Sequence, residues 1–277
     1  MSRNQSRVSA NTPEPPAIAE QPMPPNIQPQ GNPFNFIVPT EVVDLPSKGE
    51  YYGINHPLRG VSTIEIKHMT AKEEDILTSA TLLKKGIALD KMLQSIIINK
   101  AVKVDDLLIG DKNALLIASR VFGYGADYGV DVECKNCGSV FPTVFDLNEL
   151  SFKESIEVGA VEKTENNTFT ITLPQSNFVV EFKLLTSRDE ANISASKKGG
   201  SLNLLKNITV AVNEQEDPFY VERALEALPI LDASVLKKSY VAVMPDIDMT
   251  QEVDCPHCSA NFEMEVPLNA GFFWPDI

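Results

Sequence analysis

The chain has 277 residues, of which 24 are Lys or Arg and 38 are Asp or Glu, so its formal net charge at pH 7 is −14. This charge argues against a long nucleic-acid groove, which needs clustered cations to displace counterions from phosphates, and against binding to an anionic membrane surface. Hydrophobic residues make up 43% of the chain, which is enough for a sizeable core and excludes wholesale disorder.

The N-terminal segment, residues 1–35, holds eight of the 19 prolines, with Asn, Gln and Ser between them. Such a segment buries too little apolar surface to offset its ordering entropy, so we predict a disordered Pro-rich arm. It is either a passive leader or a tether that becomes ordered on a partner. The segment lacks the apolar stretch of a signal peptide, and no apolar run in the chain approaches the roughly 18 residues of a membrane span, so we expect a cytoplasmic product.

Order is expected to begin near Phe36, with extended chain to residue 45 and a strand over 62–69, where apolar and polar residues alternate. Helices and a β-hairpin with a Cys-x-x-Cys motif follow. In the second half, a polar surface link over 150–167 leads to a hairpin over 169–182, then to helices and a second Cys-x-x-Cys hairpin. The predicted helices cover 76–85, 89–99, 104–122, 202–213, 219–227 and 234–243.

The two halves of the chain are similar to each other. Residues 64–74 align with residues 180–190 at an offset of 116 positions, and residues 132–137 align with residues 253–258 at an offset of 121. The two matches occur in the same order, and their offsets differ by only five. The sequence therefore predicts an internal duplication with a small insertion in one copy.

Each predicted copy has the same plan, in which a strand leads to helices and a cysteine hairpin closes the unit. Thr70 and Thr186 each precede acidic residues at a helix start. There the hydroxyl can accept from free amides of the first turn, and the acids suit the positive end of the helix dipole. We predict an α+β fold of two such repeat units, residues 36–150 and 151–277, which follow the arm of residues 1–35.

All four cysteines lie in the two motifs, as the pairs Cys134 with Cys137 and Cys255 with Cys258. We expect each pair at the start of its hairpin. Two such knuckles are typical of a zinc ribbon, in which four thiolates bind one tetrahedral ion. Zinc suits four soft thiolates and brings no redox chemistry. We therefore predict one structural zinc ion per chain, shared by the two copies across a pseudo-twofold axis.

Other roles for the cysteines fit the sequence less well. Structural disulfides are rare in the cytoplasm, and a thioredoxin-type redox role lacks its expected fold context. A catalytic zinc needs an open coordination position, which four thiolates do not leave. His257 lies inside the second knuckle and is either a substitute ligand or a solvent-facing spacer, of which we expect the spacer.

The sequence predicts no catalytic residues and no cofactor besides zinc. None of the three histidines, His56, His68 and His257, stands with a nucleophile and an acid in a recognisable pattern. The acidic run 73–75 is explained by its place at a capped helix start. Gly123-Tyr124-Gly125 is too short for a phosphate-binding loop. These observations favour a structural or binding role over an enzyme.

Three consecutive aromatic residues, 272–274, stand close to the C-terminus and include the single Trp. Large aromatic side chains are usually buried within their own chain, and they are also enriched at interface hot spots. We expect this segment to fold back on the core, with a role as an anchor for a partner as the alternative.

Five stretches of the first half form a specific motif string. They are residues 44–49 (DLPSKG), 56–58 (HPL), 64–78 (IEIKHMTAKEEDILT), 107–114 (LLIGDKNA) and 120–126 (RVFGYGA). This string resembles the baseplate hub and hub-assembly proteins of T4-like contractile-tailed phages. The resemblance covers roughly residues 36–150, and the second half matches mainly through its knuckle and its Phe-Trp-Pro-Asp ending.

The resemblance implies a non-enzymatic tail morphogenesis protein, assembled in the host cytoplasm and located in the virion as a structural component of the baseplate hub. Its implied partners are other hub or tail-tube proteins and the tape-measure protein, with no membrane partner. An assembly chaperone that holds a hub or tape-measure segment and is absent from the finished virion is the alternative. A zinc-ribbon nucleic-acid-binding protein is a remote third reading, because Lys135 is the only cation in either knuckle of this acidic chain.

Overall fold

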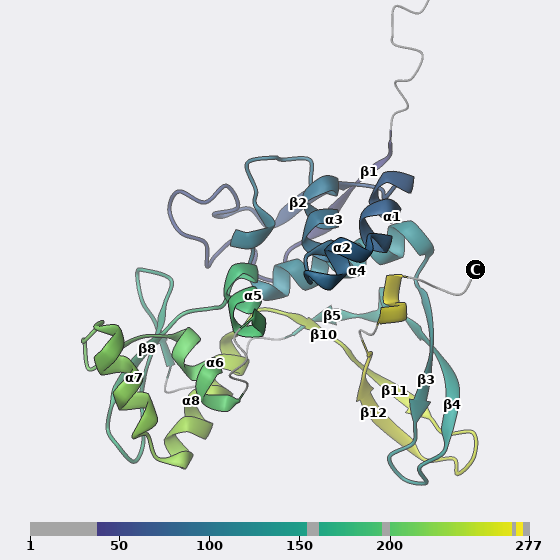
Figure 1. Cartoon of the computed structure of the whole chain (residues 1–277). Coiled ribbons are helices and arrows are strands. Elements are labelled where there is room, and N and C mark those ends of the chain that lie inside the picture. Colours follow the sequence, from purple (N-terminus) through teal and green to yellow (C-terminus); the bar gives the residue numbers. More distant parts are fainter. Residues whose placement is uncertain (1–37, 154–160, 196–199, 268–269, 274–277) are drawn as a thin grey trace, which may run out of the picture. The chain divides into compact units, whose positions relative to one another are not determined.

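The computed structural model describes residues 38–153, 161–195, 200–267 and 270–273. These residues form a mixed α+β structure, as predicted (Figure 1). The predicted Pro-rich arm and Trp274 lie outside the described residues. Within the described parts of the chain, no helix combines the length and the apolar character that crossing a bilayer requires.

The first half begins with a β-hairpin that leads into helices. Strands β1 (Thr40–Asp44) and β2 (Thr63–Lys67) pair antiparallel, from Thr40 opposite Lys67 to Asp44 opposite Thr63, which confirms the strand predicted over 62–69. The elements that follow are α1 (Ala71–Thr78), α2 (Ala80–Lys84), α3 (Ala88–Ile96), the 3₁₀ turn η1 (Val104–Asp106) and α4 (Ile109–Tyr124).

Two of the helices predicted in this half are divided. The helix predicted over 76–85 begins earlier and breaks at Ser79, whose φ of −64° and ψ of 107° are extended. The helix predicted over 104–122 is broken at 107–108, where the chain pairs with residues of the second half. Ser187 N donates to Leu107 O, Ile109 N donates to Leu185 O, and Leu108 forms a bridge with Thr186. This break comes from a tertiary contact that helical periodicity does not reveal.

The second half is built around a four-stranded antiparallel sheet with the strand order β6-β7-β8-β9. Its central hairpin, β7 (Phe169–Thr172) and β8 (Val179–Phe182), confirms the hairpin predicted over 169–182. The other elements of this half are β5 (Ser151–Phe152), β6 (Val161–Lys163), α5 (Ser187–Ala195), α6 (Ser201–Ile208), β9 (Thr209–Val212), α7 (Pro218–Glu226), α8 (Ile230–Val243) and β10 (Ile247–Asp248), which pairs with β5.

One prediction for the second half was wrong. The helix predicted over 202–213 ends at Ile208, and β9 continues as an edge strand that pairs with β8. The run Thr209–Val212 is rich in β-branched residues, which favour a strand where a neighbouring strand is available. The described residues of the link predicted over 150–167 are exposed or half-buried, as predicted for a surface link, and they include the strands β5 and β6, of which β6 pairs with β7.

The buried apolar residues of both halves form one continuous cluster. The helices of the first half contribute Leu77, Met92, Leu93 and Ile96, which are completely buried. Of the run that the sequence favours as core, Met92, Ile96 and Ile97 are buried, whereas Ile98 is 43% exposed. The second half contributes the fully buried Leu173, Val180, Phe182, Ile208 and Leu236.

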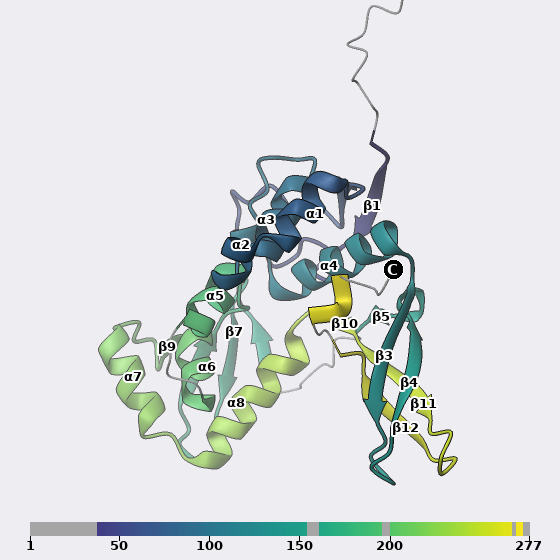
Figure 2. The same cartoon turned by 45° about the vertical axis from the view of Figure 1, so that its right-hand side comes forward.

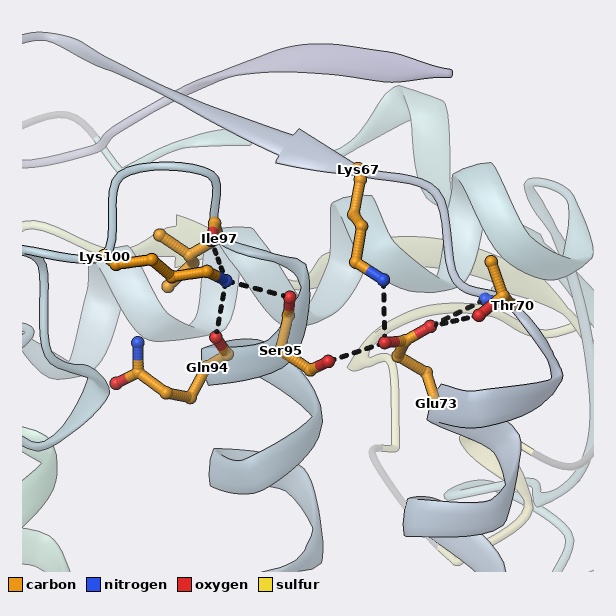
Figure 3. A network of polar contacts seen from close by, with 7 residues as sticks. All are labelled: Lys67, Thr70, Glu73, Gln94, Ser95, Ile97 and Lys100. Atoms are coloured by element: carbon orange, nitrogen blue, oxygen red, sulfur yellow. Dashed lines mark hydrogen bonds and ion pairs between the residues drawn. The ribbon is translucent and has the colours of Figure 1, made fainter. Parts of the chain in front are cut away.

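Glu73 is a completely buried carboxylate in the first turn of α1 (Figure 3). Its Oε1 accepts from Lys67 Nζ at 2.8 Å and from Ser95 Oγ at 2.6 Å. Its Oε2 accepts from the backbone N of Thr70 at 3.0 Å and from Thr70 Oγ1 at 2.6 Å. Burial raises the pKa of Glu73, but these hydrogen bonds outweigh it and hold the pKa at about 2. The carboxylate therefore links β2, the start of α1 and α3.

The start of α5 repeats this arrangement. Asp189 accepts from Lys183 Nζ at 3.0 Å, and its Oδ2 accepts from the backbone N and the hydroxyl of Thr186, each at 3.0 Å. Burial raises the pKa of Asp189, but the hydrogen bonds from Thr186 and Lys183 outweigh it and lower the pKa. In both places a Lys at the end of the preceding strand or directly after it and a Thr before the helix share one carboxylate.

A second pair of carboxylates, Asp111 in α4 and Asp232 in α8, is completely buried, as Glu73 is. Asp111 accepts from Ser47 N at 2.9 Å, Ser47 Oγ at 2.5 Å and Tyr52 Oη at 2.7 Å. Asp232 accepts from the backbone N of Gln175 at 2.9 Å and of Ser176 at 2.7 Å. Each carboxylate therefore fixes the Leu-Pro turn that follows the first strand of a hairpin to the first turn of a long helix.

We expect Glu73→Gln to destabilise the protein by about 2–3 kcal/mol, because a hydrogen bond to a charged group contributes about 1.5–3 kcal/mol and the amide cannot replace the carboxylate toward Lys67 and Thr70. The folded-state pKa of about 2 lies below the ordinary 4.5. The contribution of Glu73 is therefore present above pH 4.5 and is lost as the pH falls toward 2. Urea unfolding at several pH values measures both effects.

Glu74→Gln is the matched control, because Glu74 is the next residue of the same helix turn and is exposed. Its unfolding free energy should stay within about 0.5 kcal/mol of the parent protein. Equal effects of the two substitutions would contradict the role assigned to Glu73.

Candidate metal centre

The four cysteines lie at the tips of two β-hairpins. The first hairpin consists of β3 (Asp127–Glu133) and β4 (Val140–Asp146), and the second of β11 (Thr250–Asp254) and β12 (Asn261–Glu265). The two hairpins run beside each other in both views (Figures 1 and 2). Each Cys-x-x-Cys forms the turn between its two strands. The expectation that it stands at the start of a hairpin was therefore wrong.

The two turns have the same backbone conformation. Cys134 N donates to Ser139 O, and Gly138 N donates back to Cys134 O, each at 2.9 Å. In the second turn, Cys255 N donates to Ala260 O, and Ser259 N donates to Cys255 O, also at 2.9 Å. The residue after the second cysteine has a positive φ in both turns, 71° at Gly138 and 54° at Ser259. These bonds close each knuckle at the tip and direct both thiols of a pair to the same side.

The four sulfur atoms lie within 4.8 Å of one another. Cys134 Sγ is 3.7 Å from Cys258 Sγ, and Cys137 Sγ is 3.8 Å from Cys255 Sγ. A tetrahedral ion with Zn–S bonds of about 2.3 Å would place its sulfur ligands about 3.8 Å apart. The two pairs that join different hairpins therefore already have the separation that a four-thiolate zinc site requires.

The cluster combines buried and accessible thiols. Cys134 and Cys255, the first residues of the two motifs, are buried, whereas Cys137 and Cys258 are more accessible to solvent. Burial raises the pKa of Cys255 to about 11. Hydrogen bonds from Ser139 lower the pKa of Cys137 to about 6, and a hydrogen bond from Asn136 lowers the pKa of Cys258. Hydrogen bonds thus shift one thiol of each knuckle toward its thiolate form.

Residues of each knuckle also contact the opposite hairpin. Lys135 Nζ donates to Glu263 O at 2.7 Å and lies 5.9 Å from the ring centre of Phe262. The ring of His257 meets Phe141 edge to face, with 6.4 Å between ring centres. His257 is not part of the sulfur cluster, so it occupies the place of a spacer.

Further contacts extend from the tips to the bases of the hairpins. Tyr128 Oη donates to Pro267 O at 2.9 Å, and Gln251 Nε2 donates to Asp146 O at 2.7 Å. Phe272 and Phe273 are buried, and the ring of Phe272 lies 5.2 Å from that of Tyr128. The described part of the aromatic segment therefore folds back on the first hairpin, as expected.

Some residues of the centre carry no signal in the sequence. Asn136 Nδ2 donates to Cys258 Sγ at 3.5 Å, across the two hairpins, and its position inside the first knuckle does not reveal this contact. Tyr128 likewise joins the hairpins through a backbone carbonyl 139 positions away. Both contacts depend on how two distant segments meet.

The remaining candidate residues serve the fold. Glu73, the first residue of the acidic run 73–75, accepts the hydrogen bonds that hold the start of α1 in place. His56 stacks on Tyr52 with 4.1 Å between ring centres, and its Nδ1 accepts from Leu58 N. The Nε2 atom of His68 lies 3.4 Å from Oε1 of Glu41, and the His68 ring stacks on the ring of Phe122. Among the described residues, the four cysteines are the metal-ligand cluster that the geometry brings together.

Comparison with protein families gives a match over nearly all of these elements. A family model described as T4 bacteriophage base plate protein matches residues 38–274, which include both cysteine hairpins. Searches among curated proteins and among solved structures gave no match.

Proposed function

The chain belongs to the T4 bacteriophage base plate protein family, and from this premise we propose that it is a non-enzymatic structural component of the baseplate hub of a contractile tail. The observation that carries the proposal is the family match over residues 38–274, together with the motif string of the first half. We propose other hub or tail-tube proteins and the tape-measure protein as its partners, and the virion tail baseplate as its location after assembly in the host cytoplasm.

The structure supports this proposal through the way in which its polar residues are used. The carboxylates Glu73, Asp111, Asp189 and Asp232, of which all but the half-buried Asp189 are completely buried, hold turns and helix starts in place. Lys135, the one cation of the knuckles, is engaged with the opposite hairpin, which weakens the nucleic-acid alternative. Such a body suits a rigid building block better than a catalyst.

We further propose that Cys134, Cys137, Cys255 and Cys258 bind one structural zinc ion. The sulfur separations of 3.7 and 3.8 Å support a tetrahedral site. Four thiolates leave no position for a reacting water, so the ion would join the two hairpins rather than take part in a reaction. Because its ligands come from distant parts of the chain, binding energy would become folding energy.

We also propose that the two halves, residues 36–150 and 151–277, arose by duplication. Three pairs of matching contacts support this relationship. Thr70 and Glu73 correspond to Thr186 and Asp189, and each carboxylate accepts from a Lys at or directly after the end of the preceding strand. Asp111 and Asp232 each hold a Leu-Pro turn, and the two knuckles have the same backbone bonds. The Lys, Thr and acidic residues at the helix starts follow the offset of 116, and Asp111, Asp232 and the knuckles follow the offset of 121, whereas the two Leu-Pro turns are 128 positions apart.

The protein purified without added chelator should contain about one zinc ion per chain, because four thiolates form a complete structural site. Cys258→Ser should lower this ratio and the melting temperature, since each kcal/mol lost corresponds to about 2–4 °C for a chain of this size. Elemental analysis and thermal unfolding measure the two quantities.

His257→Ala is the matched control for the zinc site. It lies next to Cys258 but outside the sulfur cluster, so the zinc content should not change. A loss of zinc in His257→Ala, or no zinc in the parent protein, would contradict a four-cysteine site.

Quantitative mass spectrometry of purified virions, beside a lysate of infected cells, tests the proposed function. A structural hub component should be present in the particle at a small, fixed copy number. Abundance in the lysate with none in the virion would identify an assembly chaperone instead.

A further inference from the structure

The outward face of strand β4 carries three apolar side chains at alternating positions. Val140 and Val144 are 62% and 66% exposed, and Pro142 between them is also exposed. Residues at these alternating positions lie on one face of a strand. We call this set, Val140, Pro142 and Val144, the β4 outer face.

The opposite face of the same strand is already used. Phe141 and Phe145, which alternate with the outer residues, are 4% and 1% exposed and belong to the core cluster. The two faces of the strand are therefore both largely apolar, although only one of them packs within the chain. An antiparallel hairpin with one solvated face normally places polar residues on that face.

The second hairpin shows that the knuckle architecture does not require an apolar outer face. The positions three, five and seven residues after the second cysteine are Val140, Pro142 and Val144 in β4. The same positions in β12 are Asn261, Glu263 and Glu265, and all three are exposed. The pairing of the strands follows the same register after each knuckle, from Glu133 opposite Val140 and from Asp254 opposite Asn261. The apolar residues of β4 are thus particular to the first hairpin.

The free edge of β4 is unsuited to pairing with another strand. Cys134 N donates to Ser139 O and Leu147 N donates to Ala126 O, which are the bonds at the two ends of this hairpin. In an antiparallel ladder the bonded pairs alternate with unbonded ones, so the backbone groups of Pro142 point away from β3. Because Pro has no N–H at this edge, it disfavours the addition of a third strand. A partner would therefore meet the side chains of this face.

The charges beside the β4 outer face are all negative. Glu133 lies opposite Val140, Asp131 opposite Pro142, and Gly129 opposite Val144. Both acidic side chains are exposed, and neither takes part in an ion pair within the described part of the chain. Two copies of the chain that met through this face would oppose like charges, whereas a basic partner would complement them.

We propose that the β4 outer face docks another tail protein through an apolar segment flanked by Lys or Arg side chains. The apolar residues of the segment would cover Val140, Pro142 and Val144, with Gly129 leaving room beside Val144. Its cations would meet Asp131 and Glu133. This inference deepens the proposed function, because it assigns a surface and a partner chemistry to a hub component.

Site-specific photo-crosslinking in infected cells tests the proposal. A photoreactive phenylalanine analogue is placed at position 144, and the matched control carries it at position 265 of β12. The expected result is a crosslink at position 144 only, with the crosslinked peptide mapped to an apolar segment that has Lys or Arg beside it. No crosslink at position 144, equal crosslinks at both positions, or a crosslink to a second copy of this chain would overturn the proposal.

A swap variant gives a second readout. Val140→Asn with Val144→Glu introduces the residues that β12 carries at the same places, so folding and metal content should be unchanged. For this comparison, the analogue is placed at position 142 in both the swap variant and the parent chain. We expect the yield of the crosslinked product to be at least tenfold lower in the swap variant. Asp131→Lys with Glu133→Lys should reduce it in the same way, and Glu263→Gln with Glu265→Gln should not. An unchanged yield in the swap variant would overturn the proposal.

The failures of the two proposals are distinguishable. If the parent chain is present in virions but the swap variant is incorporated equally well and crosslinks equally well, the docking face is wrong and the hub assignment stands. If the mapped partner at position 144 has the expected chemistry but the chain is absent from virions, the docking face stands and the structural role in the particle is wrong.

Discussion

The packing of the two cysteine hairpins against each other is the constraint on which the rest of this structure depends. A two-stranded hairpin is at best marginally stable in water. Here β3–β4 and β11–β12 meet through four sulfur atoms at their tips and through Tyr128, Gln251 and the buried Phe272 nearer their bases. Because the hairpins come from opposite halves of the chain, their contact also fixes where those halves meet. The thiols join the two hairpins at their tips, where each hairpin consists of only two strands.

Hydrogen-bonded carboxylates, three of them completely buried, perform the corresponding task inside each half. Glu73 and Asp189 tie a strand to the start of the next helix, and Asp111 and Asp232 tie a hairpin turn to a long helix. An unpaired buried charge is costly, so each carboxylate stabilises only the arrangement in which all its donors are present. This dependence on several donors gives the turns and helix starts a single geometry, which apolar packing alone specifies less sharply. A body fixed in this way presents its outer surfaces in a defined orientation.

Much of this organisation could be predicted from the sequence, because it depends on local patterns. Alternation predicted β2, the polar turn at 174–177 predicted the hairpin of β7 and β8, and cysteine spacing predicted the four residues of the cluster. The errors arose where distant segments decide the local structure. Leu107 and Leu108 leave the helical pattern to pair with residues near Thr186, and β9 is extended because β8 lies beside it. Asn136 reaches a sulfur of the opposite hairpin, which no spacing within its own knuckle could indicate.

The two hairpins also show which of their surfaces the fold constrains. Their inner faces and knuckles must match each other, since they share the sulfur cluster and the aromatic contacts between the strands. Their outer side chains take no part in this contact between the hairpins. The sequences differ there, with Val140, Pro142 and Val144 on one hairpin and Asn261, Glu263 and Glu265 on the other. The strand pairing after each knuckle starts in the same register, so the difference cannot come from the backbone. We attribute it to a difference in what the two outer faces meet, so that two similar hairpins present distinct surfaces.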